Sequence, residues 1–187
     1  MNKARKHLKG VNINGSLVVD RNEVWKPPEE GWLKVNIDGS FNNGVGVSGG
    51  LIRDVNGVFK VGFLFKGIFT TSLRAELWGV MLGLRLAWEN NISHLVLETD
   101  ATEVTRLIGL ANFEEHNDKD VIMEIQNMLA RDWDVRVVHI SRSANKAADL
   151  MTKAALTNFP GYLPMFHPSD ELEGVLMQDL LAYKSCS

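Results

Sequence analysis

The 187-residue sequence predicts an α/β fold in which helices flank a mixed β-sheet. Three apolar segments with the alternation of β-strands follow one another, and a turn signal joins the second to the third. After them, helical and strand-like segments alternate, and a strand that returns through a helix to the next strand gives a parallel pair. The predicted order is therefore βββ, α, β, αα, β, α, a five-stranded sheet with three antiparallel strands and then two parallel additions.

The first three strands are predicted from their side-chain period. In "WLKVNIDGSF", Leu33, Val35 and Ile37 recur at every second position, as in a strand with one buried face, and the run stops at Asp38. "VGVSGGLIRD" and "VFKVGFLFK" share the turn "DVNG", whose Asn-Gly pair tolerates positive φ. We therefore expect an antiparallel hairpin after the first strand.

The segments after residue 71 complete the order. "SLRAELWGVMLGLRLAWENN" has apolar residues at helical spacing, with Ser72 as its expected N-cap. The short strand "HLVLETD" ends in Asp100, and "ATEVTRLIGL" turns helical immediately afterwards. A helix in "DKDVIMEIQNMLARDW", a strand in "VRVVHI" and a helix in "NKAADLMTKAAL" follow.

Three regions are expected along the chain. Residues 1–30 are assigned to an N-terminal basic tail and linker that ends in "KPPEEG", and residues 31–157 to the folded domain. Residues 158–187 are assigned to a C-terminal appendage with one short helix, from about Asp170 to Tyr183. We expect this late segment to dock on the domain, with docking on a partner as the alternative.

Composition limits the partners, the cysteine chemistry and the cellular location expected of the protein. The formal net charge is −3, so nucleic-acid binding must come from local groups rather than from a basic excess. The single cysteine, Cys186, allows neither a disulfide framework nor a cysteine-based zinc site. The sequence shows no membrane-spanning run and no secretory signal, so we expect an intracellular protein, in the nucleus or cytoplasm, that is not secreted and binds no membrane.

Four acids lie at compatible ends of predicted elements. Asp38 and Asp100 each end a strand, Glu76 is expected in the first turn of the long helix, and Asp149 lies near the start of the helix after the last strand. Ligands collect at the carboxyl ends of parallel strands, so these carboxylates can share one site. Crowded carboxylates need a counter-ion, and oxygen ligands without cysteine select Mg²⁺ or Mn²⁺.

Each acid also has a purely structural interpretation. Asp100 begins "DATE", a capping-box pattern in which Asp100 caps the helix and Glu103 reaches back. Glu76 and Asp149 lie where negative charge complements a helix dipole. Taken singly, these interpretations stay open, whereas the four acids together favour a shared site.

Four motifs in order carry a resemblance to a known family. "NIDGSF", "SLRAEL", "LETDATEV" and "HISRSANKAADLMTK" resemble the successive motifs of the ribonuclease H family, in the version found in plant retroelement reverse transcriptases and their stand-alone relatives. The resemblance covers about residues 31–157, and "VWKPPEEGW" is similar to the lead-in of that plant group. It implies the ribonuclease H-like fold, consistent with the element order.

The resemblance implies a metal-dependent nuclease. It assigns the metal-binding catalytic acids to Asp38, Glu76, Asp100 and Asp149, which would hold two Mg²⁺ ions, with Mn²⁺ as a substitute. It assigns His139 to proton movement or product departure. The implied reaction is endonucleolytic hydrolysis of the RNA strand of an RNA–DNA hybrid, by a monomer or by part of a larger reverse transcriptase.

The resemblance also implies substrate contacts. Polar groups near the first two motifs touch the 2′-hydroxyls in this family, and one position holds a phosphate of the DNA strand. The corresponding residues are Gly39, Ser40, Asn42, Asn43, Ser72, Thr71 for the phosphate, and Asn145 in the last motif. The alternative for each is an ordinary polar loop or helix cap.

Two other functions stay open. The segment "NFEEHNDKD" is acidic where some relatives carry a basic, tryptophan-bearing protrusion that grips the hybrid. A retroelement-derived binding or interaction module of the same fold, with little or no catalytic activity, is therefore one alternative. Another metal-dependent nuclease of the same broad fold, such as an exonuclease or integrase core, is the second.

Overall fold

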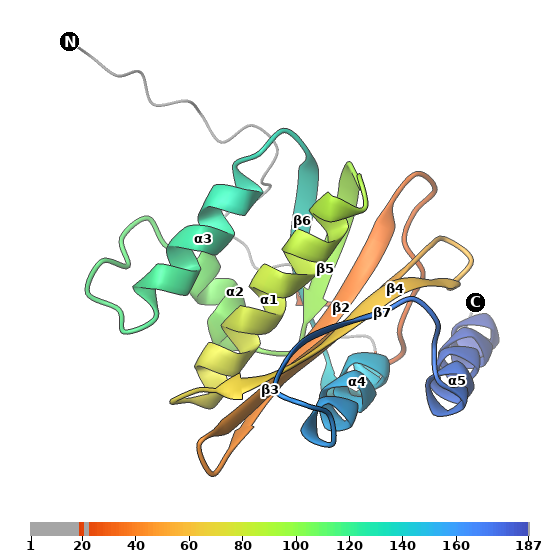
Figure 1. The fold of residues 1–187 in the computed structure, drawn as a ribbon. Coiled ribbons are helices and arrows are strands. Elements are labelled where there is room, and N and C mark those ends of the chain that lie inside the picture. The colour runs from red at the N-terminus through yellow and green to blue at the C-terminus, as the bar shows by residue number, and fades with distance from the viewer. Residues whose placement is uncertain (1–18, 21–22, 187) are drawn as a thin grey trace.

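The computed structural model describes residues 19–20 and 23–186 and shows a mixed sheet with helices on both faces (Figure 1). Most of the predicted N-terminal basic tail lies outside the described residues. No helix among those described is long and apolar enough to span a bilayer. The strands are β1 (Val19–Asp20), β2 (Leu33–Asn42), β3 (Val45–Arg53), β4 (Phe59–Ile68), β5 (His94–Thr99), β6 (Asp134–Ile140) and β7 (Gly161–Met165). The α-helices are α1 (Ser72–Glu89), α2 (Thr102–Ile108), α3 (Lys119–Leu129), α4 (Lys146–Leu156) and α5 (Asp170–Cys186), and a short 3₁₀ helix spans Arg142–Ala144.

The sheet has the strand order β1-β6-β5-β2-β3-β4-β7. β2, β3 and β4 pair antiparallel, while β5 runs parallel to β2 and β6 runs parallel to β5. The predicted mixed sheet is therefore confirmed for its five central strands. The prediction of only five strands was wrong at both edges, because β1 pairs with β6 and β7 pairs with β4.

Two apolar clusters fill the two faces of the sheet. The first joins α1, α2 and α3 to the sheet and includes Ile37, Leu84 and Ile125. The second joins α4 and α5 to the sheet and includes Leu51 and Met151. The two layers of helices in Figure 1 correspond to these clusters. Helices on both faces therefore hold the central strands, beside which the predicted acids lie.

Two glycines let helices approach the central strands closely. A Cβ on Gly39 in β2 would lie 2.5 Å from the backbone nitrogen of Glu76, and one on Gly49 in β3 would lie 2.5 Å from that of Thr152. Side chains at these positions would push α1 and α4 away from the sheet. The absence of a Cβ at Gly39 therefore brings Glu76 next to the strand that carries Asp38.

The C-terminal region is more extensive than predicted. β7 was not expected, and α5 is a helix of 17 residues rather than a short one. Leu172 and Leu176 of α5 are buried in the cluster that contains α4. Arg53 of β3 also forms a buried ion pair with Asp179 of α5, at 2.7 Å between Nη1 and Oδ2. The structure therefore places the appendage on the domain, as expected.

The described part of the N-terminal region also packs on the domain. Trp25, which we assigned to the linker, is only 1% exposed. The Arg53 guanidinium lies over its ring, with the guanidinium carbon 3.5 Å from the ring centroid. The predicted boundary at residue 31 was therefore too late, because an apolar residue before the Pro-Pro pair belongs to the packed interior.

Candidate active site

Three of the four predicted acids converge. A carboxylate oxygen from each of Asp38, Glu76 and Asp100 lies within 4.8 Å of the others. The sheet register explains this, because β2 and β5 pair in parallel up to Asn36 and Glu98. Two residues later, Asp38 lies within β2 and Asp100 directly follows β5. Glu76 joins them from α1, where it lies beyond the first turn rather than within it as predicted.

Burial and mutual repulsion raise the pKa of two of these acids. Loss of solvation, followed by repulsion from Asp38 and Asp100, raises the pKa of Glu76 to about 9. Loss of solvation and then repulsion from Asp100 raise the pKa of Asp38 to about 6. In addition, the buried Oε2 of Glu76 finds no hydrogen-bond partner among the described residues. Arg142, whose Nε lies 3.9 Å from Asp100 Oδ2, offsets this repulsion only in part.

The predicted cap of α1, Ser72, and the predicted capping box of α2, Asp100 with Glu103, were both wrong. Thr71, not Ser72, is the N-cap of α1, and its Oγ1 accepts from the backbone N–H of Arg74 at 3.1 Å. The N-cap of α2 is Ala101, and no side-chain capping bond occurs there among the described residues. Glu103, expected to reach back, pairs with Arg106 instead. The Asp100 side chain is therefore free of the capping role and faces the other acids.

Asp149 lies close to the three acids but outside their group. Its carboxylate accepts from Lys153 Nζ at 2.6 Å, one turn later in α4. It is near enough to Asp38 that its charge contributes to the raised pKa of that acid. The structure therefore places Asp149 at the edge of the predicted site, where Lys153 holds its carboxylate.

Asn145, predicted as a substrate contact, lies inside the protein next to Asp100. It is 2% exposed, and its Nδ2 donates to Asp100 Oδ1 at 3.1 Å and to the carbonyl of Ile37 at 2.9 Å. Its Oδ1 accepts from Asn36 Nδ2 at 3.3 Å. The nitrogen and the oxygen of the Asn145 amide therefore both hydrogen-bond groups of the protein, and one of these bonds holds Asp100.

His139 lies beside the third acid. Its Nε2 is 3.1 Å from Thr102 Oγ1 and 3.2 Å from the backbone carbonyl of Asp100. Its Nδ1 is buried and has no partner within the described part of the chain. The imidazole is therefore near the acid cluster, as the resemblance implied, and is oriented through one nitrogen only.

The predicted substrate-contact residues other than Asn145 lie at the surface or on the backbone of the site. Gly39 is half-buried, and its backbone lowers the pKa of Asp38 and of Glu76, against the larger effect of burial. The others are exposed on the end of β2, the tight turn that follows it and the start of α1: Ser40, Asn42, Asn43, Thr71 and Ser72. They stay predictions, because accessibility permits a ligand contact without establishing one.

The acid cluster fits a divalent cation. Its donors are carboxylate oxygens, one of which lacks a hydrogen-bond partner among the described residues. Mg²⁺ and Mn²⁺ prefer oxygen ligands of this kind. A cation at this position would also remove the repulsion that raises the pKa values of Asp38 and Glu76.

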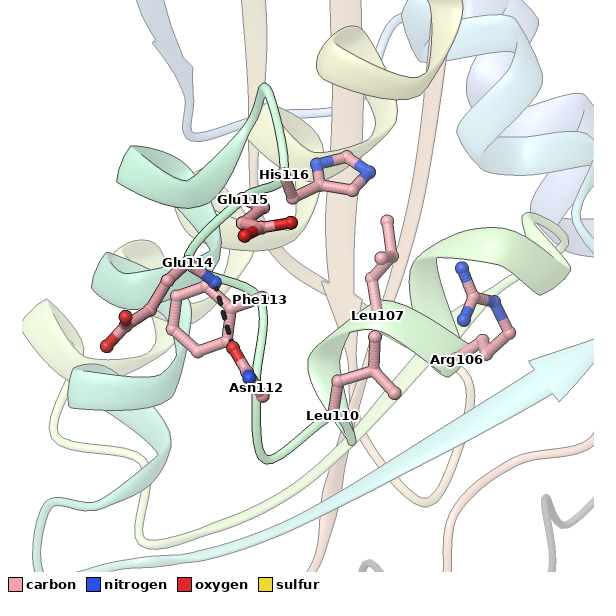
Figure 2. A pocket seen from close by; sticks show the side chains of 8 residues that line it. All are labelled: Arg106, Leu107, Leu110, Asn112, Phe113, Glu114, Glu115 and His116. Carbon is pink, nitrogen blue, oxygen red and sulfur yellow. Dashed lines mark hydrogen bonds between the residues drawn. The ribbon is translucent and has the colours of Figure 1, made fainter.

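A separate pocket of about 390 Å³ lies between α2 and the loop before α3 (Figure 2). It is lined by two leucines and Phe113 together with Arg106, Asn112, Glu114, Glu115 and His116. This is the acidic segment in which the sequence predicts no basic protrusion. The adjacent glutamates make it a poor surface for phosphate groups.

The mixed sheet, its helices and the three-acid site define a protein of the ribonuclease H-like class. Residues 36–155 match the family described as reverse transcriptase-like, and the chain belongs to this family. It is 32% identical, over 165 residues, to an Arabidopsis thaliana protein named "Putative ribonuclease H protein". That match covers 87% of this chain and 27% of the relative, so the chain spans about a quarter of the length of that protein.

Solved structures share the fold. RNase H1 from the archaeon Halobacterium salinarum aligns with a TM-score of 0.61 and 19% identity, over 67% of this chain and 97% of that one. The N-terminal RNase H domain of a Mycobacterium tuberculosis protein aligns with a TM-score of 0.62 and 16% identity, over 67% and 93% of the two chains. LC11-RNase H1, solved in complex with an RNA/DNA hybrid, aligns with a TM-score of 0.59 and 20% identity, over 66% and 95%.

Proposed function

We propose that this chain hydrolyses the RNA strand of RNA–DNA hybrids, cutting internally and depending on Mg²⁺. The observation that carries the proposal is the convergence of Asp38, Glu76 and Asp100, with a pKa of about 9 for Glu76. Such a cluster costs free energy in the folded protein unless cations neutralise it. Family membership supports the reaction type, and the hybrid bound by LC11-RNase H1 supports the substrate class.

The residues divide into three roles. Asp38, Glu76 and Asp100 would hold the cations, with Asp149 contributing once its carboxylate leaves Lys153. When bound, a pair of Mg²⁺ ions would polarise the attacking water and stabilise the charge on the leaving 3′ oxygen. His139, next to the Asp100 backbone, can carry a proton to or from the leaving group.

The substrate contacts complete the proposal. Ser40, Asn42 and Asn43 follow Asp38 on β2 and in its turn, and they present amide and hydroxyl groups to solvent. Groups of this kind can hydrogen-bond a 2′-hydroxyl, which distinguishes RNA from DNA. Thr71, exposed at the start of α1, would contact a phosphate of the DNA strand.

A second candidate function is hybrid binding without efficient hydrolysis. The adjacent Glu114 and Glu115 favour it, because their charge would weaken the grip on a polyanion in the region of the absent protrusion. A binding module would retain the fold and the acids but position the substrate too poorly for reaction.

A cleavage assay separates these functions. Purified protein with Mg²⁺ should cut an end-labelled RNA–DNA hybrid at internal positions of the RNA strand. Asp100→Asn should abolish cutting, whereas Asp132→Asn, at an exposed acid of the α3–β6 turn, should not change it. Binding of the hybrid without cutting, across Mg²⁺, Mn²⁺ and a range of salt concentrations, would favour the binding module. Equal cutting of duplex DNA would favour a nuclease of different specificity.

A further inference from the structure

Arg53 is a buried charge on which both ends of the described chain meet. It is 1% exposed, and its Nη1 donates to Asp179 Oδ2 of α5 at 2.7 Å. Its guanidinium lies over the ring of Trp25, which precedes β2. Its Nη2 donates to Asn36 Oδ1 at 2.9 Å, inside β2. This one side chain therefore connects the C-terminal helix and the N-terminal segment to the central strand.

From Asn36, a chain of amides leads to the acid cluster. Asn36 Nδ2 donates to Asn145 Oδ1 at 3.3 Å, and Asn145 Nδ2 donates to Asp100 Oδ1 at 3.1 Å. Both asparagines are buried, at 0% and 2% exposure. A path of hydrogen bonds therefore runs from Asp179 to Asp100 through three buried side chains. These are Arg53, Asn36 and Asn145.

The donor and acceptor pattern gives this path a fixed direction. A guanidinium can only donate, so it holds the carbonyl oxygen of Asn36 toward itself and leaves the Asn36 amide N–H groups for Asn145 and for Glu98 Oε2, at 2.8 Å. Asn145 must then turn its own oxygen toward Asn36 and its N–H groups toward Asp100. The reverse orientation would place a carbonyl oxygen against the carboxylate of Asp100.

Stability alone does not account for this arrangement. Arg53 Nε is buried and lacks a partner among the residues that the structure describes. A buried ion pair rarely stabilises a protein more than well-packed apolar side chains of similar size would. Costly buried polar groups of this kind are expected where they serve a functional site.

We infer that Arg53 is a positioning residue for the acid site, acting on Asp100 through Asn36 and Asn145. Helix α5, through Asp179, thereby belongs to the catalytic unit. The inference rests on the proposed function for its effect on hydrolysis, whereas the orientation of Asp100 and its effect on Mg²⁺ binding can be measured without any cleavage.

The test uses the full chain with Arg53 and Asp179 replaced together. Arg53→Met/Asp179→Leu removes both charges and retains apolar packing between β3 and α5. Titration with Mg²⁺ alone, followed by the backbone amide signal of Gly39 in ¹H–¹⁵N NMR spectra, should show about a tenfold weaker affinity, as is typical for loss of an outer partner of a metal ligand. In the metal-free variant, the side-chain amide signals of Asn145 should shift or broaden.

Two further variants make the test specific. Arg131→Met removes another arginine that lies over a tryptophan, at 4.9 Å from the ring centroid of Trp88 to the guanidinium carbon, and should leave the Mg²⁺ affinity unchanged. Asn36→Ala breaks the path but retains the Arg53–Asp179 ion pair, and it should weaken Mg²⁺ binding as much as the double variant. It decides the question if the double variant does not fold.

Each result has a defined meaning. Wild-type Mg²⁺ affinity and unchanged Asn145 amide signals in a folded double variant, or in Asn36→Ala, would overturn the inference. Weaker Mg²⁺ binding in both variants supports it, even where the wild-type chain cuts no hybrid, and in that case only the proposed function falls. A wild-type chain that cuts hybrids, together with variants that bind Mg²⁺ normally, leaves the function standing and refutes the positioning role.

Discussion

Replacing Asp38 by asparagine should stabilise the metal-free protein while destroying its site. Burial and the neighbouring Asp100 raise the pKa of Asp38 from 3.8 to about 6. Between these two pH values the folded protein keeps a proton that the unfolded chain has lost. The free energy of unfolding therefore falls as the pH rises through this interval, and above pH 6 the penalty is complete.

The size of the effect follows from this pKa difference. The interval from 3.8 to about 6 corresponds to about 3 kcal/mol at 1.36 kcal/mol per pH unit. Asp38 is only 6% exposed, so solvent screens little of this penalty. Asparagine has a similar shape, can accept the same hydrogen bonds and carries no charge. For a chain of this size, the gain corresponds to a rise in melting temperature of about 10 °C at pH 8.

The assay is denaturant unfolding of the metal-free protein between pH 3.5 and 8. The gain in the free energy of unfolding from Asp38→Asn, relative to wild type, should be near zero at the acid end of this range. It should grow as the pH rises and level off above about pH 6. Asp132→Asn, at an exposed position, is the matched control and should show no such growth. Added Mg²⁺ should stabilise wild type by mass action and should leave Asp38→Asn almost unchanged.

A constant stability difference between Asp38→Asn and wild type over the whole pH range would refute this reasoning. It would mean that the carboxylate of Asp38 is solvated in the folded protein, or that another residue neutralises it. Equal stabilisation of both proteins by Mg²⁺ would separately contradict a cation site at this acid.

Three further changes have defined outcomes. Gly39→Ala should lower the free energy of unfolding, measured with urea, by about 1–3 kcal/mol, because its Cβ would overlap the backbone of α1. Gly174→Ala is the control and should be tolerated, because a Cβ there would meet open space. Glu114→Gln/Glu115→Gln should tighten hybrid binding by about two- to fivefold at low salt and lose this advantage at high salt, as measured by fluorescence anisotropy. Lys153→Met should free the fourth predicted acid and strengthen Mg²⁺ binding about two- to fivefold by calorimetry; weaker binding would contradict its place at the site.

The central sheet could be predicted because its signals are local. The period of two in β2 and the Asn-Gly turn between β3 and β4 each lie within a few residues, and the order of elements then restricts the topology. The same reasoning placed Asp38 and Asp100 together, because the two strands are parallel neighbours. The expectation that Asp38 ends its strand was wrong, since β2 continues to Asn42. The edge strands escaped prediction: β1 has two residues, and β7 carries Pro164 and no clear alternation.

The connections that hold the site depend on distant pairs and could not be read from the sequence. Arg53 and Asp179 are 126 residues apart, and Asn36 and Asn145 are 109 apart. A charge at the end of a predicted strand, and another on a predicted surface helix, each look like ordinary exposed residues when taken alone. The buried contacts of Asn145 could not be predicted for the same reason, because its partners Asn36 and Ile37 are brought to it only by folding.

Within the part of the chain that the structure describes, costly buried groups occur along the path from α5 to the acids. Glu76 Oε2 and Arg53 Nε both lack partners among the described atoms, one in the acid cluster and the other at the far end of the amide chain. The acids need compensating charge, but Arg53 cannot supply it directly, because Asp179 already pairs with it. It contributes direction instead, because its donation to Asn36 Oδ1 acts together with the acceptors Glu98 Oε2 and the Ile37 carbonyl to orient the two amides. Arg142, 3.9 Å from Asp100, and Lys153, 2.6 Å from Asp149, offset part of the acids' charge, and a bound cation would supply the rest.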